Sequence, residues 1–418
     1  MREGWKTTKL SEVCEKITDG THQTPKYFNS GFVFLSSRNV TSGKINWDNI
    51  KYIDEAQHIA MQKRVSPRVG DILLAKNGTT GVAAMVDRDI DFDIYVSLAW
   101  LRPLEAILPD YLLHFVNSPV AKKQFNKRLK GVGVPNLHLK EIREVSISFP
   151  PLAEQKRIVA VLDEAFEGIA VALANAEKNL ANVRELFETT LNATFTKKGE
   201  GWVEFPLKDV TTKIGSGATP RGGASAYKSE GISLIRSLNV YDRRFTDRKL
   251  AFIDDVQADK LSNVVVEKGD VLFNITGASV ARCCTAPPTY LPARVNQHVA
   301  ILRPITNALS TDFLCYLMTS RQYKEQLLGI GDEGGSTRQA ITKKQLQDLK
   351  IIIPKSVEEQ NKIASKLKSI SNQTQRLEAI YQQKLAAIAE LKQTLLQKAF
   401  AGELTADMAE AKITKAVA

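Results

Sequence analysis

The sequence predicts an α+β protein: two similar α+β domains separated by two long antiparallel coiled-coil helices, with pseudo-two-fold symmetry. Three observations predict this fold. The chain of 418 residues repeats itself after roughly 200 residues, each copy opens with short β-rich runs broken by Gly, Pro and Asn, and each copy closes with a long stretch nearly free of Gly and Pro. A chain of this length is also too long for one ordinary core, so we expect more than one domain.

The internal repeat keeps its order along the chain. The matched pairs are Gly4-Trp5 with Gly201-Trp202, Arg38-Asn39-Val40 with Leu238-Asn239-Val240, Gly70-Asp71 with Gly269-Asp270, Leu101-Arg102-Pro103 with Leu302-Arg303-Pro304, and Glu154-Gln155 with Glu359-Gln360. The offset drifts only from 197 to 205 residues. A repeat of this size is larger than any solenoid unit, so it indicates a duplicated domain.

Proline marks the change from the β-rich part to the helical part in both copies, at Pro150-Pro151 and at Pro354. The expected segments follow from these breaks. They are a first domain at 1–151, a helical spacer at 152–198, a second domain at 199–355, a second helical spacer at 356–405, and a tail at 406–418.

Both helical stretches carry a heptad pattern. The apolar seam of the first runs from Ile158 to Ala193 and includes Leu186, and the seam of the second runs from Ile363 to Lys398 and includes Leu377 and Leu391. We expect the helices to pair within the chain and to run antiparallel, because a duplicated unit usually assembles about a two-fold axis. Pairing with another protein, or dimerisation, is the alternative that periodicity alone leaves open.

Composition indicates a soluble globular protein, with 43% hydrophobic and 25% charged residues. The sequence has no apolar run long enough to span a bilayer and its start lacks the apolar core of a signal peptide, so we expect a cytoplasmic protein without a membrane segment. The four cysteines have no C-x-x-C spacing and are expected to be buried, reduced thiols.

The positive charge is concentrated in the two globular parts. The balance of Lys and Arg over Asp and Glu is +5 for residues 1–151, −1 for 152–198, +5 for 199–355 and +2 for 356–418, which makes up the net charge of +11. Two equally basic domains on a nearly neutral spacer favour a polyanionic partner, and we predict that double-stranded DNA binds at two separate places.

No catalytic signature is present in the sequence. It contains no Walker-type phosphate loop, no H-E-x-x-H motif, and no Asn/Asp-Pro-Pro-Tyr/Phe box of the kind that amino-methyltransferases use. The five histidines are scattered without metal-ligand spacing. We therefore expect a non-catalytic chain without a metal or cofactor of its own.

The duplicated G-W openings, the P-P-L-A-E-Q-K-R-I start of the first helix, its E-E-Q-N-K-I counterpart and the helix end L-L-Q-K-A-F-A-G-E-L resemble the specificity subunits of type I restriction-modification systems. The resemblance covers nearly the whole chain. It departs from the family pattern at the second proline boundary, where Pro354-Lys355-Ser356 stands in place of Pro-Pro-Leu.

The resemblance implies a function and a set of partners. Each globular part would be a target recognition domain that reads one half of a split DNA sequence, and the helices would be conserved spacers that fix the gap. Two methyltransferase subunits and restriction/translocase subunits would join for adenine methylation or ATP-dependent cleavage. S-adenosylmethionine, ATP and Mg would bind those partner subunits, with the target adenine turned out of the DNA stack.

Polar residues in corresponding turns of the two domains are the candidate DNA contacts, because loops carry recognition while strands carry the core. The candidates are His22, Gln23, Arg38, Asn39, Lys76, Asn77 and Asn136 in the first domain, and Thr219, Arg221, Arg236, Asn239, Asn274, Thr276, Ser336, Arg338 and Gln339 in the second. Asn39 and Asn239 have an alternative role as capping residues of a turn.

Two other functions remain open at this point. A coiled-coil scaffold that binds only proteins would leave the matched positive charges of the two globular parts unexplained. A fused nuclease or methyltransferase would need an acidic metal cluster or a methyl-donor pocket, and the sequence offers a signature for neither.

Overall fold

The structure is a computed structural model and describes residues 4–40, 43–78, 80–129, 136–332 and 340–405. It divides into two compact units, one formed by 1–177 with 383–418 and the other by 178–382. Each unit holds one α+β domain and one half of each long helix. The tail predicted at 406–418 lies outside the described residues.

The α+β part of the first unit, here called domain 1, contains nine strands and five short α-helices among its described residues. The strands are β1 Lys6–Lys9, β2 Cys14–Asp19, β3 Phe32–Leu35, β4 Lys51–Ile53, β5 Ile72–Ala75, β6 Ala83–Met85, β7 Phe92–Ile94, β8 Leu98–Pro103 and β9 Ser146–Phe149. The helices are α1 Leu10–Val13, α2 Glu55–Gln62, α3 Pro109–Asn117, α4 Pro119–Asn126 and α5 Leu139–Arg143, with a 3-10 turn η1 at Ser37–Val40.

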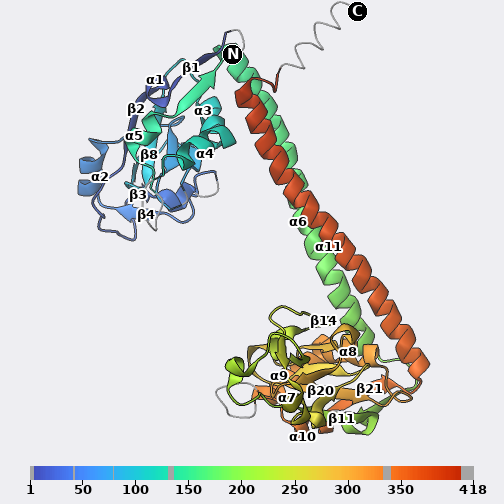
Figure 1. The fold of residues 1–418 in the computed structure, drawn as a ribbon. Helices are drawn as coiled ribbons and strands as arrows, with labels where there is room; N and C mark the ends of the chain where they lie inside the picture. Colours follow the sequence, from blue (N-terminus) through green and yellow to red (C-terminus); the bar gives the residue numbers. More distant parts are fainter. Residues whose placement is uncertain (1–3, 41–42, 79, 130–135, 333–339, 406–418) are drawn as a thin grey trace, which may run out of the picture. The chain divides into compact units, whose positions relative to one another are not determined.

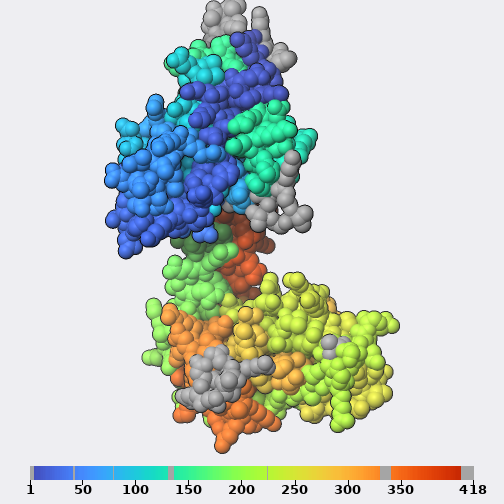
Figure 2. Space-filling view, turned by 90° about the vertical axis from the view of Figure 1, so that its left-hand side faces the viewer, coloured from blue at the N-terminus to red at the C-terminus, as the bar shows by residue number. Residues whose placement is uncertain are grey.

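Domain 1 is built on two small sheets. An antiparallel sheet has the order β2-β8-β5-β6, and a mixed sheet has the order β4-β3-β7. The apolar runs read from the sequence form their centre, since every residue of β5 is buried. The antiparallel ladder of β1 with β9 joins the two ends of the domain. In Figure 2 the N-terminal part of the chain (dark blue) lies beside the part near residue 150 (green) on the surface.

Domain 2, the α+β part of the second unit, repeats this plan. Its strands are β10 Trp202–Pro206, β11 Thr211–Ser216, β12 Ile232–Ile235, β13 Val240–Tyr241, β14 Arg244–Phe245, β15 Ala251–Ile253, β16 Val265–Val266, β17 Val271–Asn274, β18 Cys283–Thr285, β19 Ala293–Val295, β20 Val299–Pro304 and β21 Lys350–Pro354. Its α-helices are α7 Asp255–Asp259, α8 Thr311–Thr319, α9 Arg321–Asp332 and α10 Lys343–Asp348. Its 3-10 turns are η2 Leu207–Val210, η3 Gly223–Ala226, η4 Ser237–Asn239, η5 Ser262–Val264, η6 Gly277–Ser279 and η7 Pro288–Tyr290.

The sheets of domain 2 correspond to those of domain 1. The order β11-β20-β17-β18 matches β2-β8-β5-β6, the order β15-β12-β19 matches β4-β3-β7, and the β10-β21 ladder matches β1-β9. The duplication predicted from the sequence is therefore a duplication of fold, and the α+β class is confirmed.

A buried ion pair recurs at the same place in both domains. The Asp71 carboxylate accepts from Arg102 at 2.8 Å and from the indole nitrogen of Trp100 at 2.7 Å. In domain 2 the Asp270 carboxylate accepts from Arg303 at 2.7 Å. Hydrogen bonding to these carboxylates raises the pKa of both arginines, and each pair fixes the start of a central strand to its neighbour.

The long helices are α6 Leu152–Thr196 and α11 Val357–Ala401, each of 45 residues. Their starts are tied down by equivalent, fully buried glutamines. Gln155 donates to the carbonyl oxygens of Pro150 at 2.9 Å and Ala106 at 3.0 Å, and Gln360 donates to those of Pro354 at 2.8 Å and Ala308 at 3.0 Å. The Glu-Gln pair of the repeat is thus the joint between domain and helix.

Within each unit the two helices lie side by side and run antiparallel (Figure 1). In the first unit Ile158 and Leu162 share a core with Leu396 and Phe400. In the second unit Arg184 pairs with Glu378 at 3.7 Å, while Leu191, further along α6, shares a core with Leu367, earlier in α11. The prediction that the helices pair within the chain is confirmed in both units.

The predicted seam is wrong in part. Leu186 is 54% exposed and Leu391 49% exposed, whereas Phe187 and Leu396 are buried. A straight helix drifts by about 20° per heptad from a strict seven-residue repeat, and burial is concentrated where each helix meets a globular domain, so the buried stripe moves off the heptad positions. Leu377 is likewise 39% exposed.

All four cysteines are buried and none forms a disulfide, which confirms the prediction of buried thiols. Burial raises the pKa of the Cys14 thiol to about 12. Of the helices in the described part of the chain, none is long and apolar enough to cross a membrane.

Candidate nucleic-acid interface

Most candidate residues of domain 1 gather where four strands end. The turns after β2, β3, β5 and β7, at residues 20–25, 36–39, 76–77 and 95–97, are here called the strand-end edge of domain 1. Segment 95–97 joins the others, since the Val96 amide donates to the Thr21 carbonyl at 2.9 Å and the Ser97 carbonyl accepts from the Lys76 amide at 3.0 Å.

The same turns form a strand-end edge in domain 2, at residues 217–221, 236–239, 275–276 and 296–298. The Gly217 amide donates to the Asn296 carbonyl at 3.1 Å, and the Ile275 amide donates to the His298 carbonyl at 3.0 Å. The structure thus brings together, within each domain, candidates that are far apart in the sequence.

The first turn of each edge needs glycine because the backbone passes very close to a neighbouring strand. A Cβ atom on Gly20 would lie 1.8 Å from the Ile94 carbonyl oxygen, and one on Gly217 would lie 1.8 Å from the Val295 carbonyl oxygen. This explains why the Asp-Gly of the first copy and the Ser-Gly of the second keep their glycine.

Asn39 and Asn239 hold their turns from inside. Both are buried. The Asn39 side chain accepts from the Ser36 amide at 2.9 Å and donates to the carbonyls of Asn46 and Asn49. The Asn239 side chain makes the same bonds with Arg236, Thr246 and Arg248. The capping role, left open by the sequence, is the one that the structure supports.

Lys76 and Asn274 also point into their domains. Lys76 is 6% exposed, and its ammonium group lies 2.9 Å from the Asp19 carboxylate. Asn274 is fully buried and donates to the Ser237 carbonyl at 2.9 Å, although its side-chain oxygen has no hydrogen-bond partner among the described residues. We assign both to the support of the edge, because a buried, internally bonded side chain does not reach a ligand.

Asp19 anchors the edge of domain 1. It is 2% exposed and accepts from Lys76, from Arg64 at 2.6 Å and from His22 at 3.1 Å. Burial by itself raises the pKa of the Asp19 carboxyl, but the hydrogen bonds from Lys76, Arg64 and His22 outweigh it and lower that pKa. The position is Ser216 in domain 2, so this charged anchor belongs to domain 1.

The exposed candidates of domain 1 are His22, Gln23 and Arg38. His22 and Gln23 line a hollow of about 450 Å³ beside α2, and Arg38 lines a second hollow of about 360 Å³ beside Tyr27 and Lys51. These side chains combine hydrogen-bond donors with positive charge at a concave surface, which suits the edges of bases and the phosphates beside them.

Asn77 and Asn136 come together through an isolated bridge between their backbones. Their side-chain oxygens are covered and have no hydrogen-bond partner in the part of the chain that the structure describes. An unsatisfied buried acceptor costs free energy, so this pair is ready to accept from a donor that a ligand brings.

In domain 2 the polar candidates have different partners. Thr219 hydrogen-bonds to Gln297, and Thr276 lies 2.6 Å from the ring of His298. Arg221 is exposed, while Arg236 donates to the Lys249 carbonyl and lies over the ring of Tyr227 at 5.1 Å. Ser336, Arg338 and Gln339 lie outside the described residues.

The sequence reasoning missed a pair of aromatic positions. Lys51 lies 3.8 Å from the ring centre of Tyr27, which is 39% exposed, and Arg236 covers Tyr227 in domain 2. Tyr27 is exposed and Tyr227 is half-buried. An accessible aromatic ring with a cation over it suits contact with nucleic acid, since the cation meets phosphate while the ring meets sugar or base. The sequence repeat indicates these two positions, because Tyr27 and Tyr227 each stand four residues before a glycine at equivalent places in the two copies.

Among the described residues, no three His, Cys, Asp or Glu side chains lie close enough together to hold a metal ion.

Comparison with known proteins agrees with this architecture. A family model described as the type I restriction modification DNA specificity domain matches residues 2–181 and again residues 199–387. The chain is 25% identical to a putative type I restriction enzyme MjaX specificity subunit of Methanocaldococcus jannaschii, over 88% of this chain and 87% of that one. It is 21% identical to the type I restriction enzyme EcoKI specificity subunit of Escherichia coli, over 97% of this chain and 90% of that one.

Solved structures show the same likeness. The HsdS subunit from Thermoanaerobacter tengcongensis aligns with a TM-score of 0.60 at 25% identity, covering 97% of this chain and 98% of that chain. A chain solved in work on complex assembly and conformational transition of the type I R-M system aligns with a TM-score of 0.76 at 25% identity, covering 97% and 99%. The chain therefore belongs to the family of type I restriction-modification DNA specificity subunits.

Proposed function

We propose that this chain gives a type I restriction-modification complex its DNA sequence specificity by reading a bipartite duplex target, one half-site with each α+β domain. The observation that carries the proposal is that the two domains share buried supporting residues but differ in the exposed residues around them. The buried supports recur, as in Asn39 with Asn239 and Gln155 with Gln360.

The exposed positions around these supports differ between the two domains. Arg38 of domain 1 corresponds to Leu238 in domain 2, and the exposed Lys51 corresponds to Ala251, which is buried. A common scaffold that presents different hydrogen-bond donors and acceptors reads different bases. The two half-sites should therefore differ in sequence.

The DNA contacts that we propose are the exposed and half-buried members of the predicted set that the structure describes, together with the aromatic positions. They are His22, Gln23, Tyr27, Arg38, Lys51, Asn77 and Asn136 in domain 1, and Thr219, Arg221, Tyr227, Arg236 and Thr276 in domain 2. For Asn77 and Asn136, the amino group of adenine or cytosine is the donor that would satisfy their covered oxygens.

The helices would set the gap between the half-sites. The start of α6 is bonded to domain 1 through Gln155, and its end lies in the core of the second unit through Leu191 and Phe195. At about 1.5 Å per residue a 45-residue helix is about 68 Å long. We infer a constant number of base pairs between half-sites, because both ends of each helix are fixed to protein.

Catalysis would come from other subunits. We propose that two methyltransferase subunits and the restriction/translocase subunits dock on this chain and bring S-adenosylmethionine, ATP and Mg, and that the complex works in the cytoplasm. Apolar side chains exposed on the long helices, such as Val171 at 62% and Leu186 at 54%, suit the docking of protein partners. A scaffold without DNA binding is less well supported, because it gives the strand-end edges no role.

The experiment is to map methylated adenines in the genome of a host that expresses this chain with its methyltransferase subunits. The proposal predicts one motif with two different half-sites at a constant separation. A continuous motif, or two half-sites at varying separation, contradicts it.

A further inference from the structure

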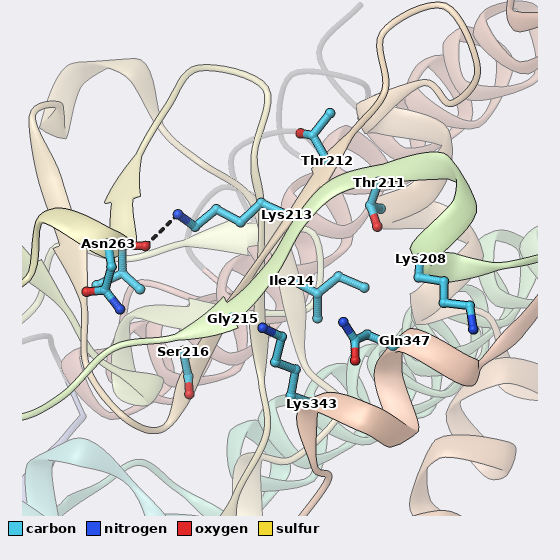
Figure 3. Close-up of a pocket in the computed structure, with 11 residues that line it drawn as sticks. Lys208, Thr211, Thr212, Lys213, Ile214, Gly215, Ser216, Asn263, Lys343 and Gln347 are labelled. Carbon is cyan, nitrogen blue, oxygen red and sulfur yellow. Dashed lines mark hydrogen bonds between the residues drawn. The ribbon is translucent and has the colours of Figure 1, made fainter.

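Domain 2 contains a basic hollow that the bipartite reading does not use. It has a volume of about 510 Å³ and follows the outer side of β11 from Thr211 to Ser216. Figure 3 shows that three lysines line it from three elements, Lys208 from η2, Lys213 from β11 and Lys343 from α10. Among the described residues of the lining, none is acidic.

Of the three ammonium groups, only that of Lys208 lies beside a carboxylate in the part of the chain that the structure describes. Lys208 lies 3.3 Å from the Asp348 carboxylate, and both side chains are half exposed. Lys213 donates to the Asn263 carbonyl, a neutral group. Lys343 is exposed and has no ion-pair or hydrogen-bond partner within residues 4–332 and 340–405 as described. The site therefore keeps an excess of positive charge that an anion can neutralise.

The corresponding place in domain 1 carries different side chains and one further hydrogen bond. Lys16 corresponds to Lys213 and makes an equivalent hydrogen bond, donating to the Arg64 carbonyl at 3.4 Å. Arg143 then reaches across and donates to the Ile17 carbonyl at 2.6 Å. In domain 2 the residue that corresponds to Arg143 is the shorter Gln347, and Lys343 replaces Leu139. Domain 2 therefore has a shorter side chain at one of these positions and an additional cation at the rim of the hollow.

The hollow borders the strand-end edge of domain 2. Its lining reaches Gly215 and Ser216, directly before the turn that carries Thr219 and Arg221. On the other side, Thr276 forms a bridge with Ala340, three residues before Lys343. A duplex that lies on this edge therefore passes beside the hollow.

We propose that this hollow binds a phosphate group of the DNA backbone, with Lys343 as its principal contact and Lys208 and Lys213 as supporting charges. The inference rests on the proposed function, because it takes the strand-end edge to be the DNA surface. Its principal residue, Lys343, corresponds to the uncharged Leu139 of domain 1, so the two domains would hold the duplex with different dependence on salt.

The test measures the binding of the full chain to a random-sequence duplex over a series of salt concentrations. The slope of log affinity against log salt counts the phosphates neutralised, at about 0.9 per contact. Lys343→Ala is expected to reduce the magnitude of that slope by about 0.9 and to weaken binding. Lys344→Ala is the matched control, because it removes the same charge one position along α10 from a side chain that does not line the hollow, and its slope should equal that of the wild type.

The outcomes separate the inference from the function on which it rests. If Lys343→Ala and wild type share one slope while both bind DNA, the phosphate site is refuted and the proposed function stands. If the wild-type chain does not bind duplex at any salt concentration, both fall. A third outcome concerns free phosphate. Inorganic phosphate could stabilise the wild type more than chloride does at equal ionic strength, and Lys343→Ala could abolish this effect while leaving the duplex slope unchanged. That result would assign the hollow to free phosphate and overturn the DNA contact.

Discussion

Domains 1 and 2 share several buried polar interactions and differ in exposed polar side chains. The buried anchor Asp19, in whose place domain 2 has Ser216, is an exception. The carboxylates of Asp71 and Asp270 hold equivalent arginines, whereas the exposed Arg38 of domain 1 is replaced by Leu238 in domain 2. Duplication therefore preserved the groups whose loss would leave partners unsatisfied in the interior, and left the surface free to change.

The largest effect is expected at the shared ion pair. Asp71→Ala and Asp270→Ala each leave a half-buried arginine without its carboxylate, and each should lower the free energy of unfolding of its own domain by about 4 kcal/mol. Urea denaturation followed by circular dichroism measures this. The exposed Asp89→Ala serves as control and should change stability by less than about 0.5 kcal/mol. If only one of the two variants is destabilised, the two ion pairs do not play the same structural role in the two domains.

The buried asparagines come next. Asn39→Ala removes one acceptor and two donor bonds from backbone groups of its turn, and Asn239→Ala removes the matching three. Each change should cost about 3 kcal/mol, because the backbone groups that remain lack partners. The same denaturation experiment tests it. A variant that keeps full stability but loses DNA binding would indicate that these residues contact DNA.

A pH effect should distinguish the two domains. The pKa of Asp19 is lowered in the folded chain, so its contribution is fully present above the ordinary pKa of 3.8 and is lost as the pH falls through the lowered value. Asp19→Asn should therefore destabilise domain 1 by about 2 kcal/mol at neutral pH. The difference from wild type should shrink as the solution becomes more acidic than the ordinary pKa, and a difference independent of pH contradicts the ion-pair account.

The smallest effect is expected on the face of domain 1. Arg38→Ala should weaken binding to the cognate duplex by about 1.4 kcal/mol, or tenfold, and relax the first half-site alone. Arg88→Ala removes the same charge from an exposed residue just beyond β6, outside the strand-end edge, and should leave the preference unchanged. Relaxation of both half-sites would mean that the two domains do not read independently.

Much of the fold was accessible from the sequence because its signals are local. Proline before each helix and the Glu-Gln that follows it mark the joints, and the repeat shows that one plan is used twice. The position of the buried stripe along α6 was not accessible, since Phe187 and not Leu186 is buried where the helix packs on domain 2, and a heptad count does not include that contact.

The sequence indicated turns that the structure brings together, but not the partners of their side chains. The turns that hold His22 and Arg38 do meet at one edge of domain 1. Lys76 looked like a contact because its partner, Asp19, stands 57 positions earlier in the chain, and sequence alone does not pair them. The contact of Lys51 with Tyr27 was missed for the same reason, because it joins separate segments.

The central claim is that two copies of one frame read two different half-sites, and a chimeric chain tests it most directly. In the chimera residues 199–355 are replaced by a second copy of 1–151, with both long helices kept. Mapping of methylated adenines in a host that expresses the chimera with its methyltransferase subunits should reveal one half-site present twice, with the gap of the wild-type target. Recovery of the original motif with two different halves would contradict the account.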